Sequence, residues 1–342
     1  MSIDIVKLID PKDLLDFSQN FSVTRNYLGD RIFPDMKTQH MKAEFFRLTD
    51  SLNLPTMAQV HALDTEAHIG RRPTAEKVKL EKMLIKEKIN QSERVQLFLE
   101  NGGNQDGVVR YVFDDVARLA ESVKTRTEVM KCELLQTGKI TVKENGVNLA
   151  VDYGVPAGNK SFTVDMSTAG ADIMGDIQTM VDAAKNNGET ITTVITSSKA
   201  LQRLRQNTAI QTAIYGTVGQ GTFVSTARLV EFLKAEFGFD VVIYDERYRY
   251  ENGKSLATKR YIEEDKFIGL STMPNATMGV GLWGVTPEEQ AAGPWTMKSQ
   301  AQFITATMWT MPDPVAVWTK ASGLFIPAMS NPNGLYIATI TY

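Results

Sequence analysis

Three histidines and one cysteine are the side chains best suited to metal binding in this sequence. His40, His61 and His68 match neither the spacing of a helical ligand pair nor that of a zinc knuckle. Cys132 has no nearby cluster of cations of the kind that activates a thiol. We therefore expect solvated histidines, an inert helix cysteine, and no metal centre.

A glycine-rich segment offers a second kind of chemistry. Gly216, Gly219 and Gly221 could bring backbone amides close to a phosphate group. However, no Gly-Lys-Ser or Gly-Lys-Thr follows, and no strand directly precedes the segment. The sequence favours a flexible loop over a phosphate site.

Hydrolytic chemistry finds no better support. Ser197-Ser198-Lys199 lacks the spacing of a serine–lysine hydrolase, and the chain has no Gly-x-Ser-x-Gly motif. The carboxylate runs Asp114-Asp115 and Glu263-Glu264-Asp265 are typical of solvated faces. Nothing assembles a nucleophile, a base and an oxyanion site, so we expect no catalytic residues and no cofactor.

Composition limits the partners that the chain can hold. Its 342 residues suit one large domain or two joined ones, and 37 basic residues nearly balance 40 acidic ones, for a net charge of −3. Such a chain has no global field with which to hold nucleic acid. If it meets DNA, we expect it to enclose the DNA without specific binding.

Targeting signals are also missing from the pattern. Residues 1–20 contain acidic residues and a proline where a secretory signal needs a basic start and an apolar run. No stretch approaches the roughly 18 apolar residues of a membrane helix. We expect synthesis in a reducing cytoplasm and no membrane association.

The clearest predicted element is a long amphipathic helix over 108–138, which Gly138 ends. The residues that follow alternate on both sides of Asn145-Gly146, the dipeptide that best tolerates a type I′ hairpin turn. A long helix that leads into a hairpin is therefore expected.

The remaining pattern predicts a mixed α+β fold without a regular βαβ rhythm. Tyr27–Asp35 reads as extended, and Ala301–Tyr342 reads as short strands because of its prolines. The other expected elements are a short helix before Asn20, a helix over 171–186, a strand over 191–197, a helical run from Leu201 to Ile210, a helix over 226–237, a strand over 239–245, a hairpin turning at Asn252-Gly253, and a strand from Lys266.

The segment from Thr56 to Asn90 is unusually charged and partly alternating. We interpret it as an outgoing strand, a polar tip with His68, Gly70, Arg71 and Arg72, and a returning strand; a helix is the alternative for its second half. An extended excursion costs ordering entropy and buries little against its own chain. It makes physical sense if a neighbouring subunit buries it, as in a shell.

The order of these elements resembles the major capsid protein E family of tailed phages, the family of the lambda-type shell protein. Four segments carry the resemblance along nearly the whole chain: RIFPDMKTQHMKAEFF (31–46), the excursion from Ala67 to Asn90, the helix and hairpin over 106–154, and the run from VVIYDERYRYENG to GVGLWG (241–284).

The resemblance implies the tailed-phage major capsid fold. It implies residues 1–40 as an N-terminal arm, 41–90 as an extended β loop with its flanking strands, and 91–160 as a peripheral domain with a long spine helix. Residues 161–314 are then mainly the axial domain, and 315–342 are strands that return to the core.

The same resemblance implies a structural protein that self-assembles into pentamers and hexamers around double-stranded DNA. Its partners would be itself, a separate scaffolding protein, a portal and, as a further candidate, a decoration protein. The expected assembly contacts at the loop are His68, Gly70, Arg71, Arg72 and Lys77. Lys77, Lys79 and Lys82 also leave open a covalent crosslink like that of some relatives.

Two other functions remain open from the sequence. An encapsulin-like compartment would share the fold but hold cargo in place of DNA. A cytoplasmic α/β enzyme would use the Gly216–Gly221 loop for a phosphorylated ligand.

Overall fold

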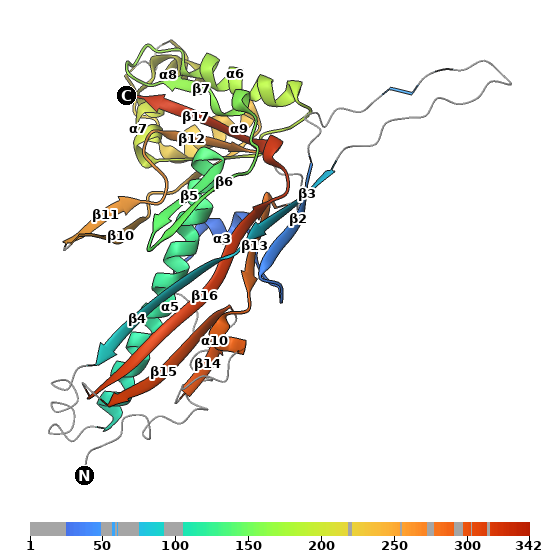
Figure 1. Ribbon diagram of the computed structural model, residues 1–342. Helices are drawn as coiled ribbons and strands as arrows, with labels where there is room; N and C mark the ends of the chain where they lie inside the picture. The colour runs from blue at the N-terminus through green and yellow to red at the C-terminus, as the bar shows by residue number, and fades with distance from the viewer. Residues whose placement is uncertain are drawn as a thin grey trace. The chain divides into compact units, whose positions relative to one another are not determined.

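The computed structural model describes residues 25–48, 57–58, 60, 75–91, 105–217, 221–253, 255–271, 277–290, 297–301, 303–312 and 315–342. These residues form two compact units. The first comprises the described parts of 1–44, 79–130 and 280–328, and the second those of 45–78, 131–279 and 329–342. The fold is mixed α/β, as the sequence predicts (Figure 1).

A six-stranded sheet forms the centre of the first unit, in the order β1-β13-β16-β15-β14, with β4 also pairing with β16. Its strands are β1 (Asp35–Lys37), β4 (Met83–Gln91), β13 (Gly279–Gly284), β14 (Met297–Ala301), β15 (Ile304–Pro312) and β16 (Val315–Met329). Close packing requires a glycine in β16, because a Cβ at Gly323 would lie 2.7 Å from the Trp283 ring and 3.1 Å from Val123.

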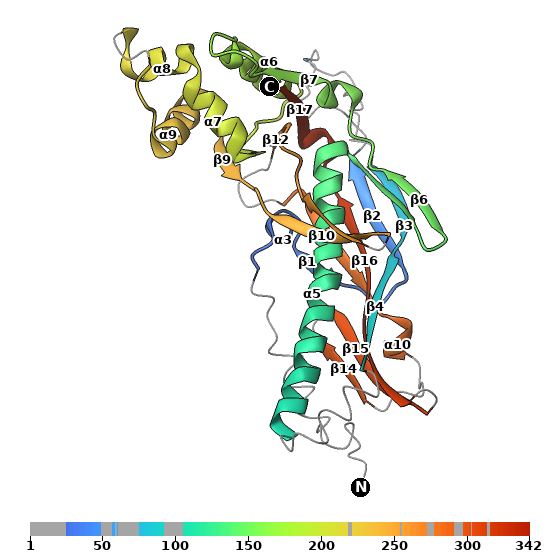
Figure 2. The ribbon, with the colours of Figure 1, turned by 90° about the vertical axis from the view of Figure 1, so that its left-hand side faces the viewer.

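Helix α5 (Gln105–Thr137) confirms the predicted long helix (Figure 2). It ends where the sequence predicts, because Gly138 adopts a φ of +70° and donates its N–H to the carbonyl of Leu134 at 2.8 Å. Val116, Ala120, Val123, Met130 and Leu134 are buried, as the apolar pattern requires.

Several polar side chains of α5 are less solvated than a simple amphipathic helix predicts. Asp115, Thr127, Glu128 and Lys131 are all buried. The helix is therefore covered on most of its circumference near its C-terminal end, which a simple amphipathic pattern does not predict.

The second half of the excursion, residues 75–90, is built from strands and not from the alternative helix. Strand β2 (Lys42–Leu48) pairs with β3 (Ala75–Glu81) as a two-stranded sheet, and β4 begins at Met83 after the single residue Lys82. The chain thus passes from β3 into the main sheet of the first unit within one residue. The proposed tip, residues 61–74, lies outside the described part of the chain.

The second unit is centred on a five-stranded sheet in the order β7-β17-β12-β8-β9. Its strands are β7 (Phe162–Asp165), β8 (Thr193–Thr196), β9 (Asp240–Ile243), β12 (Lys266–Leu270) and β17 (Leu335–Thr341). Helices α6 (Ile173–Asn186), α7 (Ser198–Gln206), α8 (Thr208–Tyr215) and α9 (Thr226–Phe237) supply apolar side chains to one buried core with these strands.

Local signals set the helix ends in this unit. Ser197 caps α7 and Ser225 caps α9, each accepting a hydrogen bond from a backbone N–H in the first turn. Asn207 caps α8 through Ala209 and Ile210, so the predicted helical run from Leu201 to Ile210 is two helices. Short helical turns at Ala157–Lys160 and Pro332–Gly334 complete the unit.

Both predicted hairpins are present. In β5 (Lys139–Glu144) and β6 (Val147–Asp152), Asn145 and Gly146 occupy the turn with φ of 48° and 81°, as a type I′ turn requires. In β10 (Arg247–Asn252) and β11 (Ser255–Arg260), Asn252 pairs with Ser255. The turn of this second hairpin therefore lies one residue later than predicted and starts at Gly253.

The prediction of an extended Tyr27–Asp35 is wrong in its central part. Leu28–Ile32 forms one short helix, α3, and Tyr27, Leu28 and Phe33 are buried. The reason is a distant partner: both carboxylate oxygens of Glu128 on α5 accept from the N–H of Gly29, at 3.0 and 3.1 Å. A carboxylate at this position satisfies a donor that the first turn of a helix leaves free.

The prediction of short C-terminal strands is also wrong. β15 has 9 residues and β16 has 15, and each contains a proline, Pro312 and Pro327 respectively. Pro312 stands at the end of its strand. Pro312 pairs with Val315 at the last position of the β15–β16 ladder. Pro327 lies beyond Phe325, the last residue of β16 that pairs with β4, so it does not interrupt the β4–β16 ladder.

Candidate assembly surfaces

The β2–β3 strand pair carries charged side chains that remain exposed. Lys77 and Lys79 on β3 are both exposed, and Lys79 contacts Glu44 at 3.1 Å in an exposed ion pair. Such a pair stabilises its own chain by about 0 to 1 kcal/mol. This ion pair therefore contributes little to the stability of its own chain.

The expected contact residues fall in two groups. Lys77 lies on β3, where the structure exposes it. His68, Gly70, Arg71 and Arg72 lie outside the described residues. Of the three lysines considered for a crosslink, Lys82 is 3% exposed, so its amine cannot reach a neighbouring subunit in this conformation.

The β5–β6 hairpin is a second exposed element. Ile140 and Val142 face inward, whereas the tip is exposed, including Val147 at 48%. The base is held by an ion pair of 2.9 Å between Lys139 and Asp152, and the hydrogen bond from Lys139 lowers the pKa of the Asp152 carboxyl. The hairpin is fixed at its root and open at its tip.

The β10–β11 hairpin is likewise held by ion pairs at its root and exposed farther out. At its root, Arg260 contacts Asp245 at 2.5 Å and Glu264 at 2.7 Å. Tyr248 packs on Tyr261 with ring centroids 5.0 Å apart. Beyond this root Leu256 is 66% exposed, so a large apolar side chain stands in solvent.

The root contacts also fix the charge state of Asp245. Burial alone would raise the pKa of this carboxyl, but hydrogen bonds from Ser198 and Arg260 hold the pKa below its usual value. Asp245 therefore stays ionised and ties the hairpin to the first turn of α7. Its hydrogen-bond partners, the Ser198 backbone N–H and the Arg260 guanidinium, give this carboxylate a structural role.

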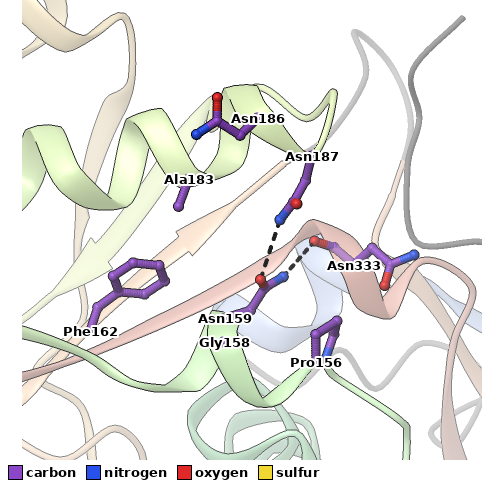
Figure 3. Close-up of a pocket in the computed structure, with 8 residues that line it drawn as sticks. All are labelled: Pro156, Gly158, Asn159, Phe162, Ala183, Asn186, Asn187 and Asn333. Atoms are coloured by element: carbon purple, nitrogen blue, oxygen red, sulfur yellow. Dashed lines mark hydrogen bonds between the residues drawn. The ribbon is translucent and has the colours of Figure 1, made fainter.

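A pocket of about 380 Å³ in the second unit is a further candidate for a ligand site. Figure 3 shows the carboxamides of Asn159, Asn187 and Asn333 around it, together with the ring of Phe162. The Asn159 amide donates to the carbonyl of Asn333 at 3.0 Å. No titratable or nucleophilic side chain lines this pocket, so it cannot perform acid–base or covalent chemistry.

The motifs considered for catalysis have structural roles in the described residues. Ser197 is the cap of α7, and Cys132 is fully buried in α5. Gly216 follows helix α8 and has no strand before it, unlike a phosphate-binding loop. His40 is exposed, and no group of three or more metal-binding side chains occurs in the described part of the chain.

One prediction about carboxylates is wrong. Asp115 is buried, and Glu264 pairs with Arg260 and also with Lys199 at 3.3 Å. The two carboxylate runs are therefore only partly solvated. Arg260 lies only four residues before Glu264, whereas Lys199 on α7 is distant in the sequence, and the local pattern does not reveal that partner.

Comparison with known proteins decides between the remaining functions. The model of the family described as phage major capsid protein E matches residues 10–340. The chain belongs to this family. It is accordingly a structural protein of the capsid shell that works by self-assembly, it is located in the virion, and it is not an enzyme.

Solved structures show the same fold for the capsid chain. One is described as a prophage capsid protein from Escherichia coli CFT073, at a TM-score of 0.62 with 14% identity over 97% of this chain and 99% of that one. A phage-related protein from Bordetella bronchiseptica RB50 aligns at a TM-score of 0.52, with 10% identity and 96% coverage of both chains. A Gordonia phage Cozz chain aligns at 0.50, with 10% identity over 94% of this chain and 89% of its own.

No curated protein sequence matches this capsid chain significantly. Within the described residues, none of its helices combines the length and the apolar character needed to cross a bilayer. The order of elements predicted from the sequence, with its long helix, hairpins and extended strand pair, is the fold that the family comparison shows.

Proposed function

We propose that this capsid protein forms pentamers and hexamers that tile an icosahedral shell around double-stranded DNA. The observation that carries this proposal is the set of exposed extended elements, β2–β3, β5–β6 and β10–β11. In the described residues, each of these elements keeps many of its side chains exposed. Contacts with neighbouring copies would compensate the ordering entropy of such elements.

We further propose a separate scaffolding protein, a portal and a decoration protein as partners, with assembly in the host cytoplasm. The near-neutral charge supports enclosure of DNA without tight binding, since counterion release needs clustered basic residues. We assign residues 1–40 to the arm, 41–90 to the extended loop and 91–160 to the peripheral domain. Residues 161–314 are then mainly the axial domain, and residues 315–342 are the returning strands. Negative-stain microscopy of the expressed chain, alone and with candidate scaffolds, tests the proposal, and a chain that never forms shells, tubes or rings would contradict it.

The strand pair should gain protection on assembly. We expect backbone amides of Lys42–Leu48 and Ala75–Glu81 to exchange more slowly in particles than in free subunits, because a neighbour buries them there. Hydrogen exchange with mass spectrometry measures both states. Peptides from α6 and β12 in the core of the second unit serve as the control and should change little. Equal protection of β2 and β3 in the two states would refute the claim.

The two adjacent arginines of the excursion are proposed to serve assembly and not DNA binding. The double change Arg71→Ala with Arg72→Ala is expected to reduce the yield of intact particles severalfold. The DNA affinity of the isolated subunit should stay negligible. The exposed Lys185 on α6 provides a matched control as Lys185→Ala. Steeply salt-dependent DNA binding by the wild type that the double variant abolishes would overturn this assignment.

A further inference from the structure

Lys82 occupies the single position between β3 and β4. On one side the chain belongs to the β2–β3 pair, and on the other it belongs to the six-stranded sheet, where Met83 pairs with Phe325. The backbone N–H of Lys82 bonds to the carbonyl of Met41, just before β2, at 3.3 Å. Lys82 and Thr38–Met41 therefore flank residues 42–81, which begin with β2 and end with β3 and to which we restrict the word excursion from here on. We call these two flanking positions its root.

The side chain of Lys82 is buried at this root, with an exposed fraction of 3%. Its ammonium donates to three uncharged oxygens: the Thr38 hydroxyl, the His40 carbonyl at 2.6 Å and the Trp283 carbonyl at 3.2 Å. Within the described residues Lys82 forms no ion pair with a carboxylate. A buried ammonium is expensive unless its donors are satisfied, and here three acceptors match its three N–H groups.

The oxygens that receive these bonds come from two separate parts of the chain. Thr38 and His40 lie in the connection between β1 and β2, whereas Trp283 belongs to β13. The backbone N–H of Thr38 also donates to the Trp283 carbonyl, at 2.8 Å. One ammonium thus joins the entry of the excursion, its exit and a strand of the main sheet.

The absence of a side chain at Gly284 leaves space for the aliphatic stem of Lys82. A Cβ added at Gly284 would lie 3.0 Å from Cδ of Lys82 and 2.6 Å from Cδ2 of Leu324. The glycine therefore allows the aliphatic stem to pass close to the backbone of β13. Burial lowers the pKa of the Lys82 ammonium, which agrees with its removal from water.

We infer that Lys82 is a latch that fixes the root of the β2–β3 excursion to strand β13. The role of its ammonium is to hold two chain segments together, because three oxygens from these segments accept hydrogen bonds from one nitrogen. Without this ammonium the same oxygens would lose a common donor, and the entry and exit of the excursion could separate. That the latch also matters for shell assembly rests on the proposed function.

Amine labelling tests the latch in the unmodified protein. Brief acetylation with an N-hydroxysuccinimide ester, read by mass spectrometry, should modify the exposed Lys79 readily. Lys82 should react more than about tenfold more slowly, because its amine becomes accessible only when the root opens. Equal labelling of the two lysines would overturn the inference.

Substitution tests the consequence for the root. In Lys82→Met the stem is kept and the ammonium is lost, so the amides of Thr38 and Lys82 should exchange severalfold faster in hydrogen-exchange measurements. Lys79→Met, three residues earlier on the exposed strand β3, is the matched control and should leave these amides unchanged. If Lys82→Met does not fold, Thr38→Val removes one acceptor and should produce a smaller increase at the same amides. Unchanged exchange in Lys82→Met, or in Thr38→Val where that variant has to replace it, would refute the latch.

Particle formation and hydrogen exchange at the root test two different claims. If Lys82→Met loosens the root but still forms normal particles, the latch stands and the proposed role of the excursion in assembly fails. If the root is unchanged, the latch fails whatever the particles do.

Discussion

Replacing Val116 by aspartate is expected to abolish soluble, assembly-competent protein. Val116 is 5% exposed on α5, so the new carboxylate would be buried in an apolar setting. A buried, unpaired charge is among the few mechanisms that cost more than about 4 kcal/mol in one substitution. The soluble yield and the urea midpoint of unfolding would both fall.

Arg118→Asp is the matched control, because Arg118 lies on the same helix but is exposed. It introduces the same side chain and changes the net charge further, yet should shift the urea midpoint little. All four tryptophans lie within residues 280–328 of the first unit, so tryptophan fluorescence follows the unit that contains Val116. A Val116→Asp protein with wild-type yield and midpoint would contradict the core position of this helix face.

The elements that the sequence predicts well are those whose determinants are local. Asn145-Gly146 accepts the two positive φ angles of its turn with no help from elsewhere. Helix α9 matches its predicted range because Ser225 caps its start and Gly238, at a φ of +83°, ends it. In such cases a few neighbouring residues contain the whole physical cause.

The wrong predictions concern segments whose structure depends on residues far away in the sequence. Nothing within Tyr27–Asp35 indicates that Glu128 will accept the N–H of Gly29 and support a helical turn. The prolines of the C-terminal region suggested interruptions, yet Pro312 stands at the last pair of the β15–β16 ladder, and Pro327 lies beyond the part of β16 that pairs with β4. Tertiary pairing thus decides what local propensity leaves open.

The features of the candidate assembly surfaces also separate into those with local causes, which the sequence shows, and those that depend on distant residues. The charged alternation of the excursion and the turn of β5–β6 are visible in the sequence, so these exposed elements could be predicted. The role of Lys82 could not be predicted, because a lysine in a charged segment is normally expected to be exposed to solvent. Its acceptors come from two distant parts of the chain: Thr38 and His40 lie in the connection between β1 and β2, and Trp283 lies on β13.

A second large effect is expected at the buried ion pair of Glu288 and Lys320. Glu288 on α10 (Pro287–Gln290) has a side chain 8% exposed, and it accepts hydrogen bonds from Lys320 and, at 3.1 Å, from Ser322. Glu288→Ala leaves the Lys320 ammonium, 14% exposed, without this partner. Such a loss typically costs about 3 to 5 kcal/mol. Urea unfolding followed by tryptophan fluorescence would measure it.

The double variant Glu288→Met with Lys320→Met separates the value of the pair from the cost of breaking it. Replacing both partners by apolar side chains of similar size is often neutral, so this protein should be more stable than Glu288→Ala. A Glu288→Ala protein as stable as the wild type would show that Lys320 finds water or another acceptor when the carboxylate is removed.

The pair also predicts a pH dependence. Burial alone would raise the pKa of the Glu288 carboxyl, but Lys320 and Ser322 hold the pKa below its usual value. A carboxyl whose pKa is lower in the folded state stabilises fully above its unfolded pKa of about 4.3, and this contribution disappears as the pH falls through the folded pKa. The wild type should therefore lose more stability than the double methionine variant between neutral pH and the acidic range. Parallel loss in the two proteins would show that other carboxylates, and not Glu288, govern the acid sensitivity of this unit.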